Sequence, residues 1–358
     1  MSGVTHGEIV RLLKLLPKYE YAFYYNHITR KGISKRLIVA VDNLKEFHKE
    51  NIKLNKTHYP YTARFFKEKI INFFSKYGAR THFNTFKLEN EDNFKYGIIK
   101  KQDLLQDLTS WETLLCSSFM MRPISELKTN PEVKLAQYNN LRSATATAAI
   151  LTKNGESEVE FYQKIVKIPH YKSVSWFQLL EKEDSKRAVE EDLRRFREIY
   201  QPIIENDFRD SFKIINGQFE KNECSSVTRY LLSNINDNVH QNLNSISPLK
   251  YDEEKKFHKK LMTREELYEK IDDSVTTLSH DELSLKIKRS LDKILLSHRN
   301  SAIFLILMSG PFLIGFYAFK YALKILLFYV ILKKKPKANK DSKEEGVEKK
   351  IQEDKSHN

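Results

Sequence analysis

The residues best suited to chemistry in this sequence are four cations in one short stretch, Arg30, Lys31, Lys35 and Arg36. Runs of aromatic and β-branched residues flank the stretch and predict two strands. Positive side chains on a loop between strands are suited to binding phosphate groups. An ordinary solvated hairpin explains the same residues without a function. The stretch is therefore a candidate phosphate site, with a structural alternative that stays open.

Histidine and cysteine give no further candidate for catalysis or metal binding. The 11 histidines form no H-E-x-x-H or H-x-x-x-H pair. The sequence also has no G-x-S-x-G elbow, Walker loop or C-x-x-C pair. The two cysteines, Cys116 and Cys224, exclude a disulfide scaffold and a four-cysteine zinc site, and they indicate a reducing compartment.

Composition points to an anionic partner. The 358 residues are long enough for two domains, and 61 Lys and Arg against 47 Asp and Glu give a formal charge of +14. Such an excess favours nucleotide, nucleic acid or a lipid surface. The aromatic residues lie in apolar stripes and are not interleaved with the basic stretch, which argues against nucleic acid.

The elements expected to position the basic stretch form a small mixed α/β region in the first hundred residues. Residues 37–41 are apolar at every position, as expected of a strand buried on both faces. A polar loop over residues 26–36 precedes this strand. The other expected elements are a strand over residues 19–25, a helix over 60–77, and strands over 81–86 and 94–99.

Beyond residue 101 the pattern is helical. Val189, Leu193, Phe196 and Tyr200 repeat at helical spacing with charges between them. Aromatic residues in such a stripe are typical of a core, and no chemistry is assigned to them. The chain therefore predicts an α+β protein with a mixed-sheet part followed by a helical part.

The C-terminal region predicts a membrane-associated segment. Residues 302–319 carry no charge, residues 325–332 continue the apolar run, and a lysine cluster follows. This pattern is typical of a membrane anchor beside an anionic lipid surface. A buried helical hairpin that turns at residues 309–311 stays open as an alternative, and a hairpin within one leaflet satisfies both. The charged tail after residue 332 predicts disorder.

A series of local matches over residues 17–205 resembles the mitochondrial phosphatidate cytidylyltransferases, the translocator assembly and maintenance family. The matches keep the family's order and nearly its spacing. They include Phe47-His48, Asn51, Asn55, His58-Tyr59, Phe83-Asn84, Lys95-Tyr96-Gly97, Asp107, Trp111, Asn140-Leu141, Phe161-Tyr162 and Tyr200-Gln201-Pro202.

The resemblance implies an architecture and an activity. The architecture is an N-terminal segment (1–16), a nucleotidyltransferase-like α/β domain (17–121), a helical domain (122–300), the membrane-associated segment (301–332) and the tail (333–358). The activity is Mg²⁺-dependent transfer of CMP from CTP to phosphatidic acid, which releases pyrophosphate and gives CDP-diacylglycerol for cardiolipin synthesis. The implied location is the matrix side of the mitochondrial inner membrane, although residues 1–16 form no clear presequence.

The resemblance also implies site residues. Asn84, Lys95 and Arg122 match positions expected at the nucleotide, where Lys95 and Arg122 are able to pair with phosphate. Other matching polar positions are His58, Tyr59 and Asp107. A structural hydrogen bond is an alternative role for His58, as is a helix-face carboxylate for Asp107.

The chain departs from the family at the positions that would contact phosphate and metal. Asn26 and His27 replace a Gly-Ser pair, and Arg36 replaces an acidic residue that would hold Mg²⁺. A guanidinium at that point repels a metal ion. Asp42 is the nearby carboxylate that would have to substitute as a ligand. Two hypotheses therefore stay open: an active cytidylyltransferase with an altered metal arrangement, or a catalytically silent relative that binds nucleotide, anionic lipid or a protein partner.

Overall fold

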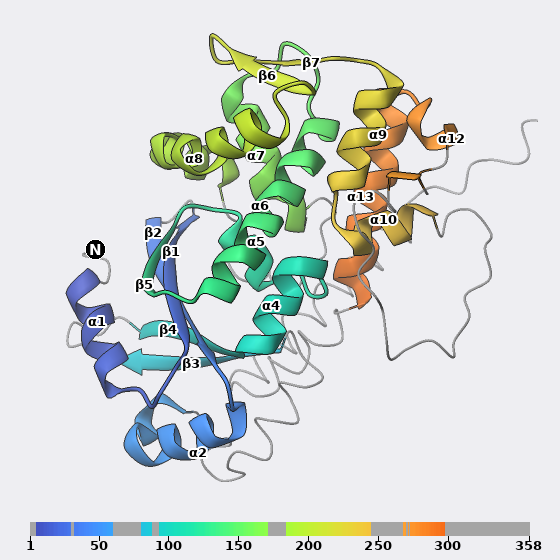
Figure 1. Ribbon diagram of the computed structural model, residues 1–358. Helices are drawn as coiled ribbons and strands as arrows, with labels where there is room; N and C mark the ends of the chain where they lie inside the picture. Colours follow the sequence, from blue (N-terminus) through green and yellow to red (C-terminus); the bar gives the residue numbers. More distant parts are fainter. Residues whose placement is uncertain are drawn as a thin grey trace, which may run out of the picture. The chain divides into compact units, whose positions relative to one another are not determined.

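The computed structural model describes residues 5–29, 32–59, 80–87, 93–170, 184–244, 268–269, 271 and 273–297. These residues form a mixed α+β fold (Figure 1). The helix expected over 60–77, the apolar segment 301–332 and the charged tail lie outside the described residues. Within the described ranges, no helix is both long and apolar enough to cross a bilayer.

A five-stranded mixed sheet carries the N-terminal part of the chain. Its strands lie in the order β3-β4-β2-β1-β5, and only the central pair β2 and β4 is parallel. Four of these strands were expected from the sequence, β3 and β4 at nearly these positions and β1 and β2 over part of their length, whereas β5 was not. The strands are β1 (Tyr21–Thr29), β2 (Gly32–Val41), β3 (Thr81–Lys87), β4 (Asn93–Lys100) and β5 (Ile124–Lys128).

The first two strands form one long hairpin, and the polar loop predicted over residues 26–36 is wrong. Pairing runs without interruption from Tyr21 opposite Ala40 to Thr29 opposite Gly32. Cross-strand hydrogen bonds satisfy the polar backbone at both strands, so polar side chains do not end them. The consequence for the site is that Arg36 lies within a strand, where its side chain has a defined face.

Alternation along the strands divides the sheet into two faces. Leu37, Val39 and Val41 face the helices α1 (His6–Leu15) and α2 (Leu44–Leu54). Ile38 and Ala40 face the other layer, which consists of α4 (Lys101–Ser110), α5 (Cys116–Met120) and the start of α6 (Pro131–Leu151). The run over 37–41 is therefore buried on both sides, as its apolar sequence predicts.

Gly97 of β4 allows the close packing of the second face. A Cβ atom at this position would lie 2.7 Å from Cδ1 of Ile38, and 3.0 Å from side-chain atoms of both Phe83 and Thr81. Such distances are shorter than van der Waals contact, so a larger residue would force the core apart.

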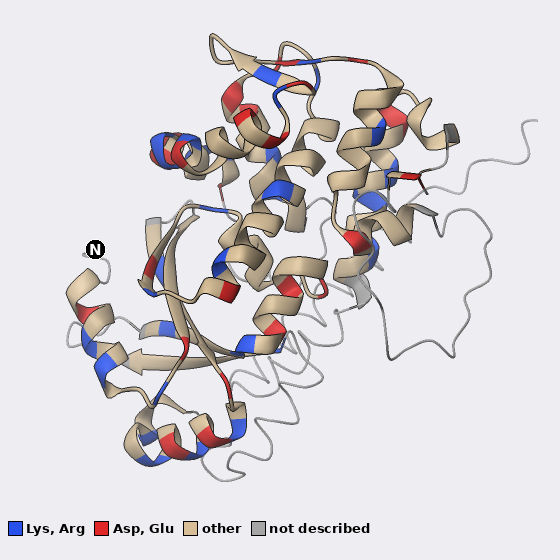
Figure 2. Cartoon of the chain, viewed as in Figure 1, with Lys and Arg blue, Asp and Glu red and all other residues tan. Residues whose placement is uncertain are grey.

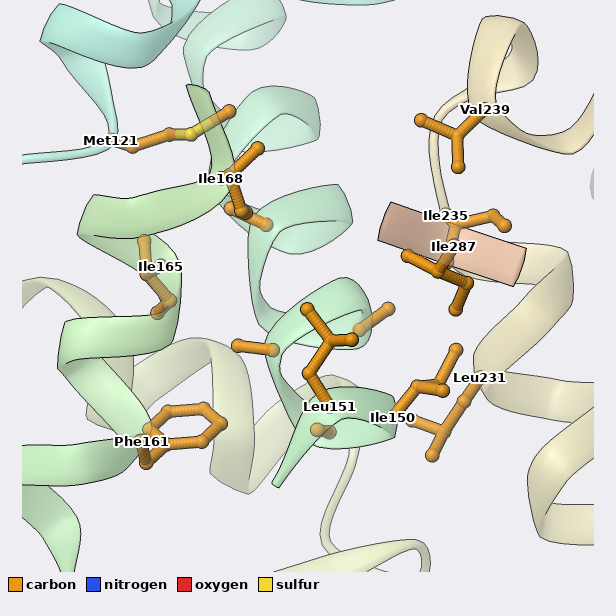
Figure 3. Close-up of a cluster of buried hydrophobic side chains, with 14 of the residues drawn as sticks. Met121, Ile150, Leu151, Phe161, Ile165, Ile168, Leu231, Ile235, Val239 and Ile287 are labelled. Atoms are coloured by element: carbon orange, nitrogen blue, oxygen red, sulfur yellow. The ribbon is translucent and has the colours of Figure 1, made fainter. Parts of the chain in front are cut away.

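The remaining elements build a second, mainly helical core. Its buried residues include Val189, Phe196 and Tyr200, so the stripe predicted along this helix is confirmed. Figure 3 shows part of this core, where Phe161 and Ile165 lie along one helix and Ile168 directly follows its end. The elements are α7 (Glu158–Lys167), η2 (Ile168–His170), α8 (Ser185–Asp207), β6 (Phe212–Ile215), β7 (Gln218–Lys221), α9 (Ser225–Asn234), α10 (Asp237–Asn244), α12 (Asp273–Thr276) and α13 (His280–Ser297).

The outer surface of α8 carries both signs of charge. Figure 2 shows Lys and Arg mixed with Asp and Glu around this helix. Arg187 pairs with Glu191, and Arg194 pairs with Glu198, each one helical turn apart. Exposed pairs of this kind contribute only about 0.3–0.5 kcal/mol each, so the mixture indicates a solvated face.

Candidate anion-binding site

Cations gather on the face of the sheet that packs against α4, α5 and α6. Tyr25 of β1 lies directly opposite Arg36 of β2, so both side chains point to the same face. In the parallel pair, Leu37 is aligned with Tyr96, which places Arg36 beside Lys95 on the face of Ile38 and Ile99. Sheet register therefore brings two cations together from residues 59 positions apart in the sequence.

A third cation comes from the connection between α5 and β5. The guanidinium of Arg122 lies over the ring of Tyr25, 5.8 Å from its centroid. Phe119 stacks on the same tyrosine, with 4.7 Å between the ring centroids. Arg122 is only 6% exposed. Tyr25 thus lies between Arg36 on the neighbouring strand and Arg122 on the α5–β5 connection, and Lys95 lies on the far side of Arg36.

Asp107 fixes the turn between α4 and α5, the helix that leads into Arg122. This buried carboxylate lies in the last turn of α4 and accepts hydrogen bonds from the backbone N–H groups of Thr113, Leu114 and Ser117, at 2.7, 2.9 and 2.8 Å. It also accepts one from the Thr113 hydroxyl at 2.8 Å. Trp111 and Leu114 have positive φ angles of 49° and 53°, which non-glycine residues rarely adopt. The carboxylate therefore holds an otherwise unfavourable turn, and its role is structural.

The cations act on one another and on Tyr25. Burial, and secondly the charge of Arg36, lower the pKa of Lys95. Burial lowers the pKa of Arg122 to about 10, although Tyr25 and Tyr200 raise it, so this group stays charged at neutral pH. Burial raises the pKa of Tyr25 despite the opposing effect of Arg122 and Arg36. The cluster is therefore positive at neutral pH and is suited to an anion.

The described residues at this cluster do not fit Mg²⁺. Magnesium requires oxygen ligands, usually carboxylates. In the described part of the chain, no three His, Cys, Asp or Glu side chains are placed to hold a metal. Among those same residues, no carboxylate is a cause of the pKa shifts of Tyr25, Lys95 or Arg122. Arg36 supplies positive charge where the family resemblance implies a ligand.

The other replaced or substitute positions lie around β1 and β2. Asn26 and His27 are half-buried residues of β1 that pair with Lys35 and Ser34. Asp42 follows the opposite end of β2 from Arg36, about 20 Å away for six residues of extended strand. Its exposed carboxylate lies 3.8 Å from Nζ of Lys101. Asp42 is therefore not part of the cation cluster.

The polar positions Asn84, His58 and Tyr59 lie on the other face of the sheet, in a buried network under α2. Asn84 donates to the hydroxyl of Tyr96 at 3.3 Å, and Nδ1 of His58 lies 2.8 Å from the same hydroxyl. The structure thus separates Asn84 from Lys95 and Arg122, although the sequence grouped all three. Asn84 does not contact the cluster.

Three further residues complete this network. Asn51 donates to the hydroxyls of Tyr59 and Tyr96, at 2.9 and 3.1 Å. Nδ1 of His48 lies 2.8 Å from the Tyr59 hydroxyl, and Nε2 of His82 lies 2.9 Å from Oδ1 of Asn84. Most of these residues belong to the series that carries the family resemblance, so that part of the series marks a structural network. His82 was not identified from the sequence, because nothing in its local pattern marks a buried partner.

The larger pocket found in the described residues lies elsewhere. Its volume is about 470 Å³, and it opens between α7, α8 and the β6–β7 hairpin. The buried Glu158 and the exposed Arg197 form an ion pair in its wall, at 2.6 Å. None of the site residues expected from the sequence lines it.

The described residues thus form an α+β protein with cations gathered on one face of its mixed sheet. Comparison with known proteins gives the family: the one described as "Phosphatidate cytidylyltransferase, mitochondrial" matches residues 24–322. The match covers most of the chain, and the chain belongs to this family.

Individual relatives agree with this assignment. The protein named mitochondrial phosphatidate cytidylyltransferase in Dictyostelium discoideum is 27% identical over 240 residues, which are 59% of this chain and 56% of that protein. Its Saccharomyces cerevisiae namesake is 29% identical over 223 residues, 61% of this chain and 56% of that protein. The mouse namesake is 28% identical over 188 residues, 51% of this chain and 55% of that protein. The chain spans little more than half the length of the relatives it matches.

Proposed function

We propose that this protein transfers a cytidylyl group from CTP to phosphatidic acid, giving CDP-diacylglycerol and pyrophosphate for cardiolipin synthesis. The cation cluster of Arg36, Lys95 and Arg122 on one sheet face is the observation that carries the proposal. Both substrates present phosphate groups, and a fixed set of cations binds such groups through charge-assisted hydrogen bonds. Membership of the family supplies the identity of the substrates.

The reaction needs the cluster for two tasks. A phosphate oxygen of phosphatidic acid attacks the α-phosphorus of CTP, a new P–O bond forms, and the bond to the β-phosphate oxygen breaks. The leaving pyrophosphate takes the bonding electrons and gains negative charge. Positive side chains that are already in place stabilise that charge, and they align the two anions against their mutual repulsion.

We further propose that the five-stranded sheet and its covering helices are the nucleotidyltransferase-like part of the chain. This part then includes β5, which lies beyond the boundary expected at residue 121. We also propose that the protein lies at an anionic membrane, on the matrix side of the mitochondrial inner membrane, with the apolar residues 301–332 as its membrane-associated segment. The names of the relatives, which include the word mitochondrial, support the organelle.

The test is an assay of the purified full chain with labelled CTP and vesicles that contain phosphatidic acid. The assay is run once with Mg²⁺ and once with a chelator. The expected product is labelled CDP-diacylglycerol, with a rate that falls at least about tenfold in Lys95→Ala, because one charge-assisted hydrogen bond is lost. Asp42→Ala is the matched control and is expected to keep the full rate.

Absence of product under every condition would favour the second hypothesis, a catalytically silent relative. One observation favours that hypothesis: a guanidinium stands where the family resemblance implies a metal ligand. Retained binding of CTP or of phosphatidic acid vesicles, together with no turnover, would identify a binding protein with the same fold.

A further inference from the structure

The cation cluster contains two adjacent cations whose charge no described residue balances. Among the described residues, neither Arg36 nor Lys95 forms an ion pair, although they lie side by side on neighbouring strands. Arg36 is half-buried, and the half-buried Arg142 elsewhere is paired with Asp207 at 3.3 Å. Adjacent like charges are unfavourable unless an anion joins them. This arrangement therefore indicates a bound anion.

The geometry of the sheet determines what kind of anion fits. Arg36 and Lys95 lie on neighbouring strands, which are about 5 Å apart. Arg122 comes from the α5–β5 connection and lies over the ring of Tyr25, the residue opposite Arg36. A single phosphate is small for three cations that extend over two strands and a loop. A chain of linked phosphates presents several negative oxygens over a comparable span. The triphosphate of a nucleotide has this form.

A metal ion would compete with these cations instead of assisting them. Where carboxylates line a triphosphate site, Mg²⁺ is needed because it bridges the negative protein groups and the negative phosphates. Arg36 needs no such bridge, since its guanidinium donates directly to phosphate oxygens with a fixed fork geometry. A Mg²⁺ ion on the triphosphate would lower the charge of the ligand and lie close to a fixed positive group.

We propose that Arg36 takes the place of the metal ion in this protein, so that the cluster binds the triphosphate of CTP directly as the metal-free anion. The proposal rests on the proposed function for the identity of the nucleotide, but not for the mode of binding. Burial of Arg122 against Tyr25 keeps that guanidinium in position before the ligand arrives. Asp107 contributes indirectly as a positioning residue, because it holds the turn before α5 and the first turn of α5, the helix that leads into Arg122.

The experiment measures binding by isothermal titration calorimetry with the full chain. The ligands are CTP and inorganic tripolyphosphate, each in the presence of a chelator and again with excess Mg²⁺. Both ligands are expected to bind in the chelator, and Mg²⁺ is expected to weaken the binding about tenfold, since it masks charge on the ligand. Binding that requires Mg²⁺ would overturn the proposal.

Two charge reversals on neighbouring residues give a matched pair. Arg36→Asp is expected to abolish binding in the chelator and to make any remaining binding depend on Mg²⁺. Lys35→Asp makes a comparable charge change on the opposite face of the same strand, and it is expected to change the affinity less than about twofold. Equal effects of the two variants would show a diffuse electrostatic attraction and refute the site. If Arg36→Asp does not fold, Arg36→Gln replaces it, with a loss of at least about tenfold expected.

The outcomes separate this inference from the proposed function. Metal-free binding that depends on Arg36, without any CDP-diacylglycerol, would leave the inference standing and remove the activity. Formation of product only with Mg²⁺, together with unchanged binding in Arg36→Gln, would support the activity and remove the inference.

Discussion

Tyr96 donates its phenolic hydrogen to Nδ1 of His58, across 2.8 Å. The direction follows from the partners of the hydroxyl, because Asn51 and Asn84 both donate amide hydrogens to it. A phenol has two acceptor positions and a single hydrogen. Both acceptor positions are filled, so the hydrogen must go to His58. Nδ1 of His58 is therefore unprotonated, and the buried network requires this histidine to be neutral.

Acid is expected to destabilise the protein through the histidines of this network. Burial lowers the pKa of His48, His58 and His82, and that of His82 falls to about 4 from its usual 6.5. Between these two values the unfolded chain binds more protons than the folded chain, so acidification lowers the free energy of unfolding. The contribution of His82 alone is about 2 kcal/mol lost by pH 5.

Urea unfolding at a series of pH values from 7.5 to 5 tests this expectation. His82→Gln removes one titrating group. The loss of unfolding free energy between pH 6.5 and pH 5 is therefore expected to be smaller by about 2 kcal/mol in this variant. The same substitution at the exposed His6 is the control. A decline of the same slope in His82→Gln and in the unmodified protein would contradict the assignment.

Tyr96→Phe is expected to lower the free energy of unfolding by about 2–4 kcal/mol. The substitution removes one hydroxyl and leaves two buried amide donors and one histidine nitrogen without their partner. Tyr24→Phe is the matched control, because its hydroxyl makes only an exposed contact of 3.4 Å with His6, and a change below about 0.5 kcal/mol is expected there. Equal losses in the two variants would show that the network contributes nothing specific.

Asp107→Ala is expected to cost about 3–5 kcal/mol, since four donors lose their acceptor and the turn with positive φ angles loses its support. Asp103→Ala on the same helix removes a half-exposed contact with Arg80 and is expected to cost about 1 kcal/mol or less. Chemical denaturation measures both. If Asp107→Ala folds, it is also expected to weaken tripolyphosphate binding while Asp103→Ala does not, because Asp107 anchors the start of α5, the helix that leads into Arg122.

Gly97→Ala is expected to destabilise the protein by about 1–3 kcal/mol through overpacking. The new methyl group would meet Ile38 at 2.7 Å. Adding Ile38→Val, which removes that contact atom, is expected to recover part of the loss. Gly7→Ala is the matched control, since the nearest atom to its new methyl group is 4.0 Å away. In helix α1 this change is expected to stabilise the protein by up to about 1 kcal/mol.

The sequence predicts the buried strand residues well and misses β5, for a physical reason. Residues 37–41 are buried on both faces, so burial alone imposes an apolar run that marks the strand. β5 has the sequence ISELK and lies at the edge of the sheet, where one side of the strand is open and polar residues are tolerated. The end of the β1–β2 hairpin, residues 26–29 and 32–35, was also missed as strand. Backbone pairing and not side-chain burial defines the strands there.

The candidate site was predictable as separate residues but not as a cluster. Arg36, Lys95 and Arg122 were each identified from the sequence, as was the family. Their convergence depends on the pairing register of three strands, which a local pattern does not contain. Asn84 was grouped with the cluster from the sequence, but it lies on the opposite face of the sheet. Its neighbour Phe83 faces the cluster side, because successive residues of a strand alternate between the two faces.

Because the register of the β1–β2 hairpin is uninterrupted, an odd or even number of positions along β2 decides which face of the sheet a side chain reaches. Arg36 reaches the cluster because an even number of positions separates it from Ile38 and Ala40, which face the same helices. Insertion of one residue between Arg36 and Leu37 would send the guanidinium to the α1 and α2 side and lose the cluster, even if every hydrogen bond of the hairpin re-formed. Insertion of two residues would return it to the original face, one step further along the strand. Insertions in this hairpin are thus expected to be tolerated two residues at a time. The cluster depends on the position of Arg36 along the strand as strictly as on its residue type.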